Sequence, residues 1–219
     1  MLRLVIFGPQ GAGKGTQGSL ISEEWGIPAI STGDIFRWKI AQGTELGRDV
    51  KEYVDNGDLV PDRLTIRLIR DRLAQEDTSS GWLLDGFPRN IGQAEALERL
   101  TTELGAVLDA ALLLEIPEDV SLHRILGRMV CSGCGRNYHV DAPPKEDSVC
   151  DVCGEAVVER SDDHDKEAIR KRLRTYYEET APLADFYDSR GLLRRIDGYG
   201  SPEDIFERIK RDLQSVSHR

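Results

Sequence analysis

Long apolar runs are missing from this chain of 219 residues. The longest one near the N-terminus is LVIF at residues 4–7, and a glycine follows it at once. Such a run is too short for a signal peptide and far too short to span a bilayer. Hydrophobic residues nevertheless make up 39% of the sequence, which is enough for one sizeable core. We therefore expect a globular protein of the cytoplasm.

Positively charged residues are also in deficit. The chain has 29 Lys and Arg against 39 Asp and Glu, which gives a formal net charge of -10. This balance argues against a broad surface for nucleic acid or anionic membranes. A small polyanionic ligand stays compatible, because a few arginines in one cleft outweigh a diffuse acidic surface. No apolar helix face stands out as exposed, so we expect a monomer.

Cysteine is confined to one stretch, CSGCGRNYHVDAPPKEDSVCDVCG, at residues 131–154. It contains two Cys-x-x-Cys pairs, formed by Cys131, Cys134, Cys150 and Cys153. This spacing predicts a tetrahedral four-cysteine zinc site, and the expected cytoplasmic location disfavours disulfides. Four thiolates would fill the coordination sphere, so the zinc would be structural and not catalytic. The alternatives are iron on the same sulfurs, a pair of disulfides, or free thiols.

Short apolar runs alternate with helical patterns along the rest of the chain. The expected strands are residues 2–7, 28–31, 82–86, 110–116 and 192–197. The expected helices are residues 14–25, 34–56 with a break at Gly43, 61–75, 91–104, 118–129, about 164 onward with a kink at Pro182, and a last helix capped by Ser201. This alternation predicts an α/β fold with a parallel five-stranded sheet flanked by helices. Residues 130–158 show no core periodicity, so we expect an excursion folded around its own metal.

The sequence GPQGAGKGT, from Gly8 to Thr16, follows the first expected strand and opens the first expected helix. In this context glycines let backbone N–H groups surround a phosphate, the helix N-terminus adds positive potential, and Lys14 adds a mobile charge. We therefore predict a P-loop for a nucleoside triphosphate. Gly15 stands after the lysine, where Ser or Thr is usual, so a direct Mg²⁺ bond from the following threonine is not assumed. Asp85, at the end of WLLD, is the expected Mg²⁺ partner, although such an aspartate can also cap a turn.

Arginines stand where the expected fold would place a ligand. Arg37 in STGDIFR and Arg89 in DGFPR follow the ends of strands, and ligands bind at that edge of a parallel sheet. Further arginines flank the cysteine stretch: Arg128, Arg160, Arg170 and Arg172. A guanidinium binds two phosphate oxygens at once, so these residues are candidates for phosphate binding, although many helical arginines are merely solvated.

The motifs occur in an order that matches one family. GPQGAGKGT, STGDIFR, GDLV, LLDGFPRNIGQA, GRMV, YHV, RSDD, and RKRL followed by TAPL together resemble adenylate kinase in its long-lid form, over nearly the whole chain. The resemblance implies reversible transfer of a phosphoryl group from MgATP to AMP, giving two ADP. It also implies three parts: a P-loop core at residues 1–30, 61–126 and 165–219, an AMP-binding insertion at 31–60, and a zinc-binding lid at 127–164.

The same resemblance implies roles for individual residues. ATP would be held by Gly11, Ala12, Gly13, Lys14, Gly15, Thr16, Arg124, Arg128, Asn137, Tyr138 and Gly200. AMP would be held by Thr32, Arg37, Asp58, Leu59, Val60, Gly86, Phe87, Pro88, Arg89, Gln93, Arg160 and Arg172. The residues implied in catalysis are Lys14, Asp85, Arg89, Arg128, Arg160 and Arg172.

Three positions depart from the family pattern. Asn90 follows GFPR, where Thr is usual and Asn occurs in UMP/CMP kinases. Because Thr32 and Gln93 match adenylate kinases, we interpret Asn90 as a helix cap. The segment before KRL is slightly longer than usual, so Arg170 competes with Arg172, and we prefer Arg172 because KRL and TAPL fix the alignment downstream. DGYGSPED is also slightly longer, so the backbone contact with ATP there is not tied firmly to one residue.

The implied reaction needs no general base, because the attacking AMP phosphate is already ionised, with a second pKa of about 6. The histidines fall in unrelated sequence contexts, at His123, His139, His164 and His218. Catalysis would consist of positioning two anions and neutralising charge, under a lid that excludes water. The alternatives are another nucleoside monophosphate kinase, with UMP or CMP as acceptor or GTP as donor, and a non-catalytic zinc-ribbon module that binds nucleotides.

Overall fold

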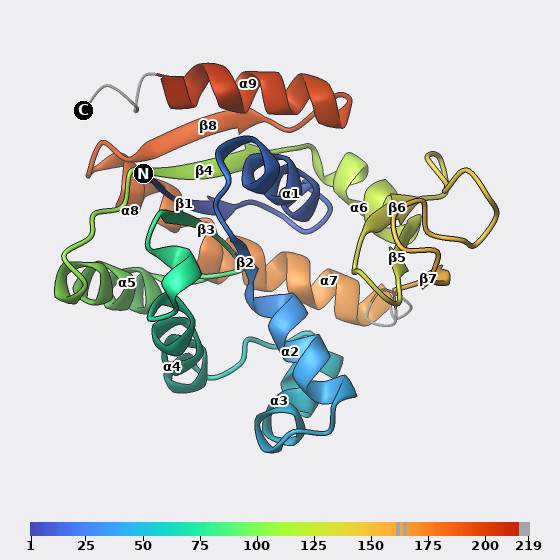
Figure 1. The fold of residues 1–219 in the computed structure, drawn as a ribbon, viewed down its shortest axis with the longest axis horizontal. Coiled ribbons are helices and arrows are strands. Elements are labelled where there is room, and N and C mark those ends of the chain that lie inside the picture. The colour runs from blue at the N-terminus through green and yellow to red at the C-terminus, as the bar shows by residue number, and fades with distance from the viewer. Residues whose placement is uncertain (161–162, 164–165, 215–219) are drawn as a thin grey trace.

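The computed structural model describes residues 1–160, 163 and 166–214. Its centre is a parallel sheet with the strand order β2-β3-β1-β4-β8. The strands are β1 Leu2–Phe7, β2 Ala29–Ser31, β3 Gly81–Asp85, β4 Ala110–Glu115 and β8 Leu193–Asp197. This sheet confirms the predicted fold class, and its order places β1 in the middle, between β3 and β4 (Figure 1).

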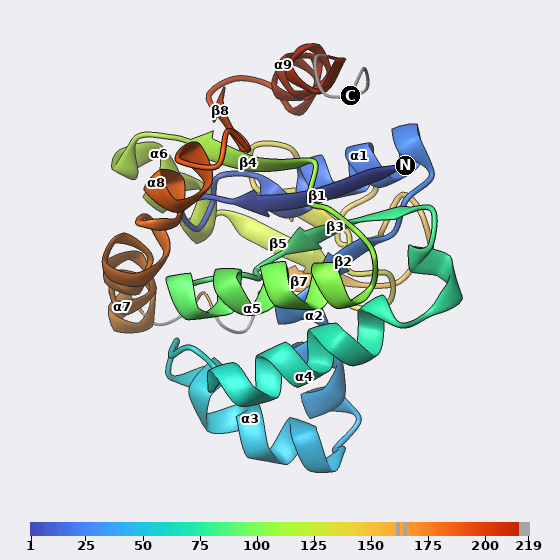
Figure 2. The ribbon, with the colours of Figure 1, turned by 90° about the vertical axis from the view of Figure 1, so that its left-hand side faces the viewer.

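Helices cover both faces of the sheet (Figure 1, Figure 2). They are α1 Lys14–Trp25, α4 Asp62–Leu73, α5 Ile91–Glu103, α8 Leu183–Asp188 and α9 Pro202–Gln214. α1 and α9 pack on one face with Leu4 and Ile6 of β1, and α4, α5 and α8 pack on the other with Val5 and Phe7. The strands are therefore apolar on both sides, which is typical of a buried parallel sheet.

Two helix caps predicted or interpreted from the sequence are present. The Asn90 side chain accepts a hydrogen bond of 2.8 Å from the backbone N–H of Gln93 at the start of α5. This contact confirms the interpretation of Asn90 as a cap. Ser201 accepts a bond of 3.1 Å from the backbone N–H of Asp204 at the start of α9. Pro61 directly precedes α4, so that helix begins one residue later than predicted.

A pair of short helices projects from the central sheet at the bottom of Figure 1, to the right of α4. They are α2 Thr32–Ala41 and α3 Glu45–Asp55, which correspond to the predicted helix with a break. The break lies at Gly43, whose φ of 62° is a left-handed conformation that favours glycine. Phe36, Val50 and Val60 form a small core between the two helices and the segment that follows them.

Two predictions about residues 118–158 were wrong in part. The helix α6 is Glu118–Leu126 and ends before Met129, because β5 begins directly after it as Arg128–Cys131. β5 pairs antiparallel with β6 Asn137–His139 and β7 Val157–Glu159. We call these three strands the small sheet, and it lies apart from the central sheet, to the right in Figure 1. The predicted excursion therefore exists, but it contains regular strands.

The last connection runs through α7 Lys166–Thr175, a π-helical turn at Tyr176–Thr180, and then α8. The predicted start of this helix at His164 lies outside the described residues. The predicted interruption at Pro182 is confirmed, because α8 begins at Leu183, although regular α-helix already ends at Thr175. Among the residues that the structure describes, no helix has the length and apolar character needed to cross a membrane.

Candidate functional site

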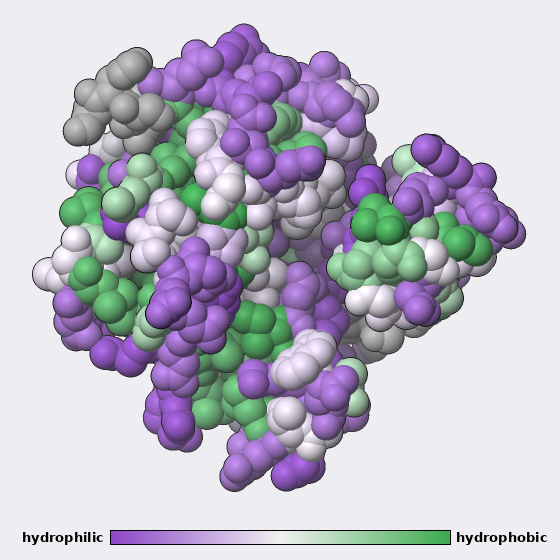
Figure 3. Space-filling view, viewed as in Figure 1, coloured by the Kyte–Doolittle hydropathy of each residue, from purple (hydrophilic) through white to green (hydrophobic). Residues whose placement is uncertain are grey.

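A cavity of about 660 Å³ lies where the carboxyl edge of the central sheet meets α2, α3 and the small sheet. Figure 3 shows the surface hollowed between the small sheet, at the right, and the body of the molecule. Nearly all residues that the resemblance assigned to nucleotides line this cavity. Ala12 and Phe87 do not, because their side chains lie in the two cores. Only the backbone of these two residues is therefore available to a ligand.

The loop between β1 and α1 is built from sharp glycine turns. Gly8 has a φ of 148°, and a Cβ atom there would lie 2.4 Å from the carbonyl oxygen of Leu114, so a larger residue does not fit. Gly13 has a φ of 93° and directly precedes α1. It carries no side chain that caps the helix, which leaves the first N–H groups of α1 for an anion. Ser121 of α6 donates a hydrogen bond of 2.5 Å to the carbonyl oxygen of Gln10 and so fixes the loop.

Lys14 folds back over this loop. Its Nζ atom donates to the carbonyl oxygens of Gly8 and Pro9, each at 2.8 Å. Burial lowers the pKa of Lys14 to about 8, and the charge of Asp85 opposes this shift. Burial raises the pKa of Asp85, and Lys14 opposes that shift in turn. An anion bound in the loop would therefore favour the charged form of the lysine.

A buried carboxylate contacts two of the arginines that line the cavity. The side chain of Asp163 is 5% exposed, and it accepts hydrogen bonds from Arg128 Nε at 2.7 Å and Arg128 Nη2 at 2.9 Å. Arg172 Nη1 lies 3.2 Å from the same carboxylate, and Gln10 Nε2 donates to it at 3.0 Å. The importance of Asp163 was not predicted from the sequence. The motif RSDD contained it, but nothing there shows which aspartate meets the arginines.

The structure distinguishes the two arginines that competed for one role. Arg172 lines the cavity, and its stem lies against Gly57, with a distance of 3.0 Å from a Cβ placed on that glycine to Arg172 Cγ. Arg170 is exposed and faces a separate shallow depression beside Asp55 and Glu167. Position in the cavity therefore supports the choice of Arg172.

The end of the cavity next to α2 has a fixed set of polar groups. Gln93 is buried, and its Oε1 accepts a bond of 2.8 Å from the backbone N–H of Arg89. Its Nε2 donates to Asp62 Oδ1 at 2.7 Å, so both ends of the amide are oriented. Thr32 is also buried and donates its hydroxyl to the carbonyl oxygen of Gly86 at 2.8 Å. Sequence reasoning missed Asp62, which lies far from Gln93 along the chain.

The opposite end of the cavity is organised by Arg124 of α6. Its Nη1 donates to the carbonyl oxygen of Gly198 at 3.1 Å and lies 3.5 Å from that of Gly11. Its Nη2 lies 3.5 Å from the carbonyl oxygen of Gly200. These contacts bring the P-loop and the loop before α9 together. Gly11 and Gly200, both predicted to hold ATP, therefore lie on either side of Arg124.

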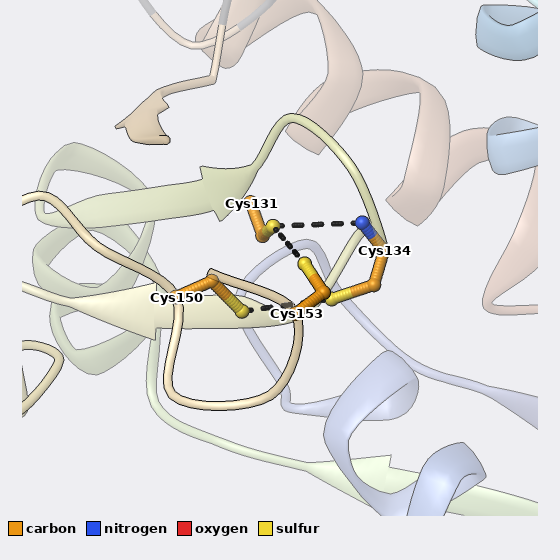
Figure 4. A group of neighbouring side chains, drawn as sticks. All are labelled: Cys131, Cys134, Cys150 and Cys153. Atoms are coloured by element: carbon orange, nitrogen blue, oxygen red, sulfur yellow. Dashed lines mark hydrogen bonds between the residues drawn. The ribbon is translucent and has the colours of Figure 1, made fainter. Parts of the chain in front are cut away.

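The four cysteines converge in the small sheet, as Figure 4 shows. Their sulfur atoms all lie within 4.8 Å of one another, with Cys131 and Cys153 at 3.4 Å and Cys134 and Cys150 at 3.6 Å. A tetrahedral Zn–S₄ site has sulfur separations of about 3.8 Å, from Zn–S bonds of about 2.3 Å. The backbone N–H of Gly133 points to the Cys131 sulfur at 3.4 Å. The donor set therefore fits structural zinc.

Other groups near the cysteines are already engaged. Tyr138 donates its hydroxyl to the Cys150 sulfur at 3.4 Å, and this bond lowers the pKa of Cys150 to about 6. Asp151, the nearby carboxylate, accepts from the backbone N–H of Lys145 at 2.9 Å. His139 turns away toward α6. The thiolates are thus the ligands that the geometry offers to a metal.

A glycine loop between a central parallel strand and a helix, with a lysine and a ring of arginines, defines a P-loop nucleotide-binding protein. Residues 6–192 match the family model described as "Adenylate kinase". The chain is 50% identical over 214 residues to an adenylate kinase of Clostridium novyi, covering 97% of this chain and 99% of the relative. It is 49% identical over 213 residues to an adenylate kinase of Caldanaerobacter subterraneus, covering 97% of this chain and 96% of the relative. The chain belongs to the adenylate kinase family.

Proposed function

We propose that this protein transfers a phosphoryl group reversibly from MgATP to AMP, giving two ADP. The observation that carries the proposal is one continuous cavity. The P-loop lies at one end of it, and the buried side chains of Thr32 and Gln93 lie at the other. Arg89, Arg128 and Arg160 line the same cavity near Lys14, where the two phosphate chains would meet. Membership of the adenylate kinase family supports the same activity.

The acceptor side is proposed to hold AMP. Thr32, Gly86, Pro88, Arg89 and Gln93 line that end, and the oriented amide of Gln93 suits the donor and acceptor edge of a purine. The other acceptor-side residues are Arg37, Asp58, Leu59, Val60, Arg160 and Arg172, with Phe87 contributing its backbone alone. The donor side is proposed to hold ATP through Gly11, Ala12, Gly13, Lys14, Gly15, Thr16, Arg124, Arg128, Asn137, Tyr138 and Gly200.

The chemistry is proposed to rest on positioning and charge. The AMP phosphate is ionised at neutral pH and attacks without a general base. Lys14, Arg89, Arg128, Arg160 and Arg172 neutralise the oxygens of the transferring group in a site that excludes water. Mg²⁺ bound with ATP supplies further positive charge on the phosphates. Asp85 stands at the end of β3 and interacts electrostatically with Lys14. It is the carboxylate proposed to hold that ion or its water shell.

The chain is proposed to divide into a P-loop core, at residues 1–30, 61–126 and 165–219, and two insertions. The AMP-binding insertion spans residues 31–60 and the lid spans 127–164. Zinc on the four cysteines keeps the lid rigid, because so short a segment buries little apolar surface of its own. The lid moves as one body and carries Arg128 and Arg160 onto the phosphates.

We propose a cytoplasmic monomer. The cysteine sulfurs are arranged as a metal site and not as disulfides, which suits a reducing compartment. Both nucleotide ends of the cavity are built from this one chain. Its partners are therefore the small molecules ATP, AMP and ADP.

The proposal is tested by measuring turnover with MgATP against AMP, UMP, CMP and GMP as acceptors, using zinc-loaded protein. We expect AMP to give the highest kcat/KM by at least about 100-fold, because a hydrogen-bonding pocket discriminates strongly against the wrong base. Preference for UMP or CMP would instead place the protein among the pyrimidine nucleotide kinases. Nucleotide binding without turnover of any acceptor would leave only a binding module.

A further inference from the structure

A second group of metal-binding side chains lies at the edge of the small sheet. His123 stands near the end of α6, His139 ends β6, and Asp141 follows in the next turn. His123 Nε2 lies 2.7 Å from Asp141 Oδ2, and His139 Nδ1 lies 3.3 Å from the same oxygen. The planes of the two imidazole rings are inclined by 53°, with centroids 5.3 Å apart. One ligand atom from each residue therefore falls within 4.8 Å of the other two.

The group spans the junction between α6 and the small sheet. Gly127 separates the two elements, and a Cβ atom on it would lie 2.3 Å from His139 Nε2. The absence of a side chain there lets the imidazole come close to the helix end. The backbone N–H of Val140 donates to the carbonyl oxygen of Gly127 at 2.9 Å, and His139 Nε2 lies 3.4 Å from that of His123. These contacts hold His139 beside the end of α6. The backbone N–H of Asp141 donates to His139 Nδ1 at 3.1 Å, so an ion on that nitrogen would replace this bond.

The donor set selects a class of ion. Two imidazoles and one carboxylate suit borderline dications such as Zn²⁺, Co²⁺ and Ni²⁺, whereas Mg²⁺ prefers oxygen ligands alone. With bonds of about 2.0–2.2 Å, the ligand atoms of a tetrahedral site lie about 3.4 Å apart. The 3.3 Å between His139 Nδ1 and Asp141 Oδ2 is close to this value, whereas the 2.7 Å between His123 Nε2 and Asp141 Oδ2 is a hydrogen-bond distance that an ion would lengthen.

We propose that His123, His139 and Asp141 form a second metal site, for a borderline transition-metal dication, that ties α6 to the small sheet. This site has no residue in common with the four-cysteine site. His123 and Asp141 are each 65% exposed and all three residues line the rim of the cavity, so an ion enters from solvent. Water fills its remaining coordination positions. When the ion is bound, the connection at Gly127 is bridged by metal–ligand bonds in addition to hydrogen bonds.

The test is a titration of zinc-loaded protein with Co²⁺ in the absence of nucleotide, because ATP would chelate the metal. We expect about one Co²⁺ per chain with the weak visible absorption of nitrogen and oxygen ligands. Intense thiolate-to-cobalt absorption would report exchange into the cysteine site instead. His123→Gln should weaken the binding by about 100-fold, since it replaces the imidazole ligand. Asp141→Asn should weaken it by about ten-fold, since it removes the carboxylate charge and keeps only a neutral amide oxygen. Asp119→Asn removes an exposed carboxylate from the first turn of the same helix and should leave the binding unchanged.

Several results would overturn the site. Binding of Co²⁺ that survives His123→Gln, or that falls equally in Asp119→Asn, would place the ion elsewhere or reduce it to a general charge effect. Failure to bind beyond exchange with zinc would show that the three residues only hydrogen-bond to one another. The bridging role has its own readout, because an ion that ties two elements of the folded chain raises the melting temperature. Co²⁺ should raise it for the wild type and not for His123→Gln, and equal shifts would refute the bridge.

Discussion

Removing Arg172 should slow phosphoryl transfer far more than it destabilises the fold. The side chain is 15% exposed, and its Nη1 donates to Asp163 Oδ1 at 3.2 Å. Arg128 binds the same carboxylate. Removing one hydrogen-bond donor to the charge that develops in a transition state raises the activation free energy by about 2.7–4 kcal/mol. Removing an arginine that binds the transferring phosphoryl group lowers the rate by up to about 10⁵-fold. We therefore expect Arg172→Ala to lower kcat by about 10³-fold. Folding should lose about 1–3 kcal/mol, since Asp163 keeps Arg128 and Gln10 as partners.

Arg170 provides the matched control for this experiment. It lies on the same helix but outside the cavity, so Arg170→Ala should change kcat by less than about two-fold. Arg172→Lys keeps the charge and loses the planar fork, so its rate should fall between wild type and alanine. The assay is coupled ADP formation from ATP and AMP, with melting curves for each variant. A low kcat for Arg170→Ala together with a normal kcat for Arg172→Ala would refute the choice of Arg172 over Arg170. A normal kcat for both variants would refute a catalytic role for either arginine.

Three further predictions concern other parts of the structure. The pKa of Lys14 is about 8, so the lysine loses its charge above pH 8 and the Kd for ATP should rise there by about ten-fold per pH unit. Lys14→Arg keeps the charge and should flatten this pH profile. Calorimetry that shows a Kd independent of pH for the wild type would contradict the prediction. Cys150→Ser should lower both the bound zinc and the melting temperature, and an unchanged melting curve would argue against a structural metal. Asp62→Ala should raise the KM for AMP by about ten-fold and leave the KM for ATP unchanged, because Gln93 loses its orienting partner; Asp62→Asn, which keeps an acceptor oxygen, should largely restore the KM.

The sequence predicted the central sheet and most of the cavity, because both depend on local patterns. Apolar runs mark the buried strands, and the P-loop follows the first of them. The end of α6 was not predictable from the same pattern, since Met129 continues the apolar spacing of Leu122 and Ile125. Residues 128–131 instead pair with strands that lie further along the chain. The short strands of the small sheet are partly exposed, so they carry little periodic signal.

Contacts between distant segments of the chain were not predicted from the sequence. Asp163 stands in an acidic run, and only the fold shows that it is buried between Arg128 and Arg172. Asp62 reaches Gln93 only after α4 packs beside α5. His123 and its partners come together only because β6 folds back onto the end of α6. Such contacts join distant segments, and neither spacing nor composition encodes them.

The most direct test of the central claim is to supply zinc-loaded protein with ADP and Mg²⁺ alone and to separate the products by anion-exchange chromatography. Two ADP molecules should occupy the two ends of the cavity and exchange one phosphoryl group. We predict that ATP and AMP appear in equal amounts and at equal rates. Persistence of ADP, or AMP with inorganic phosphate and no ATP, would contradict the proposed reaction.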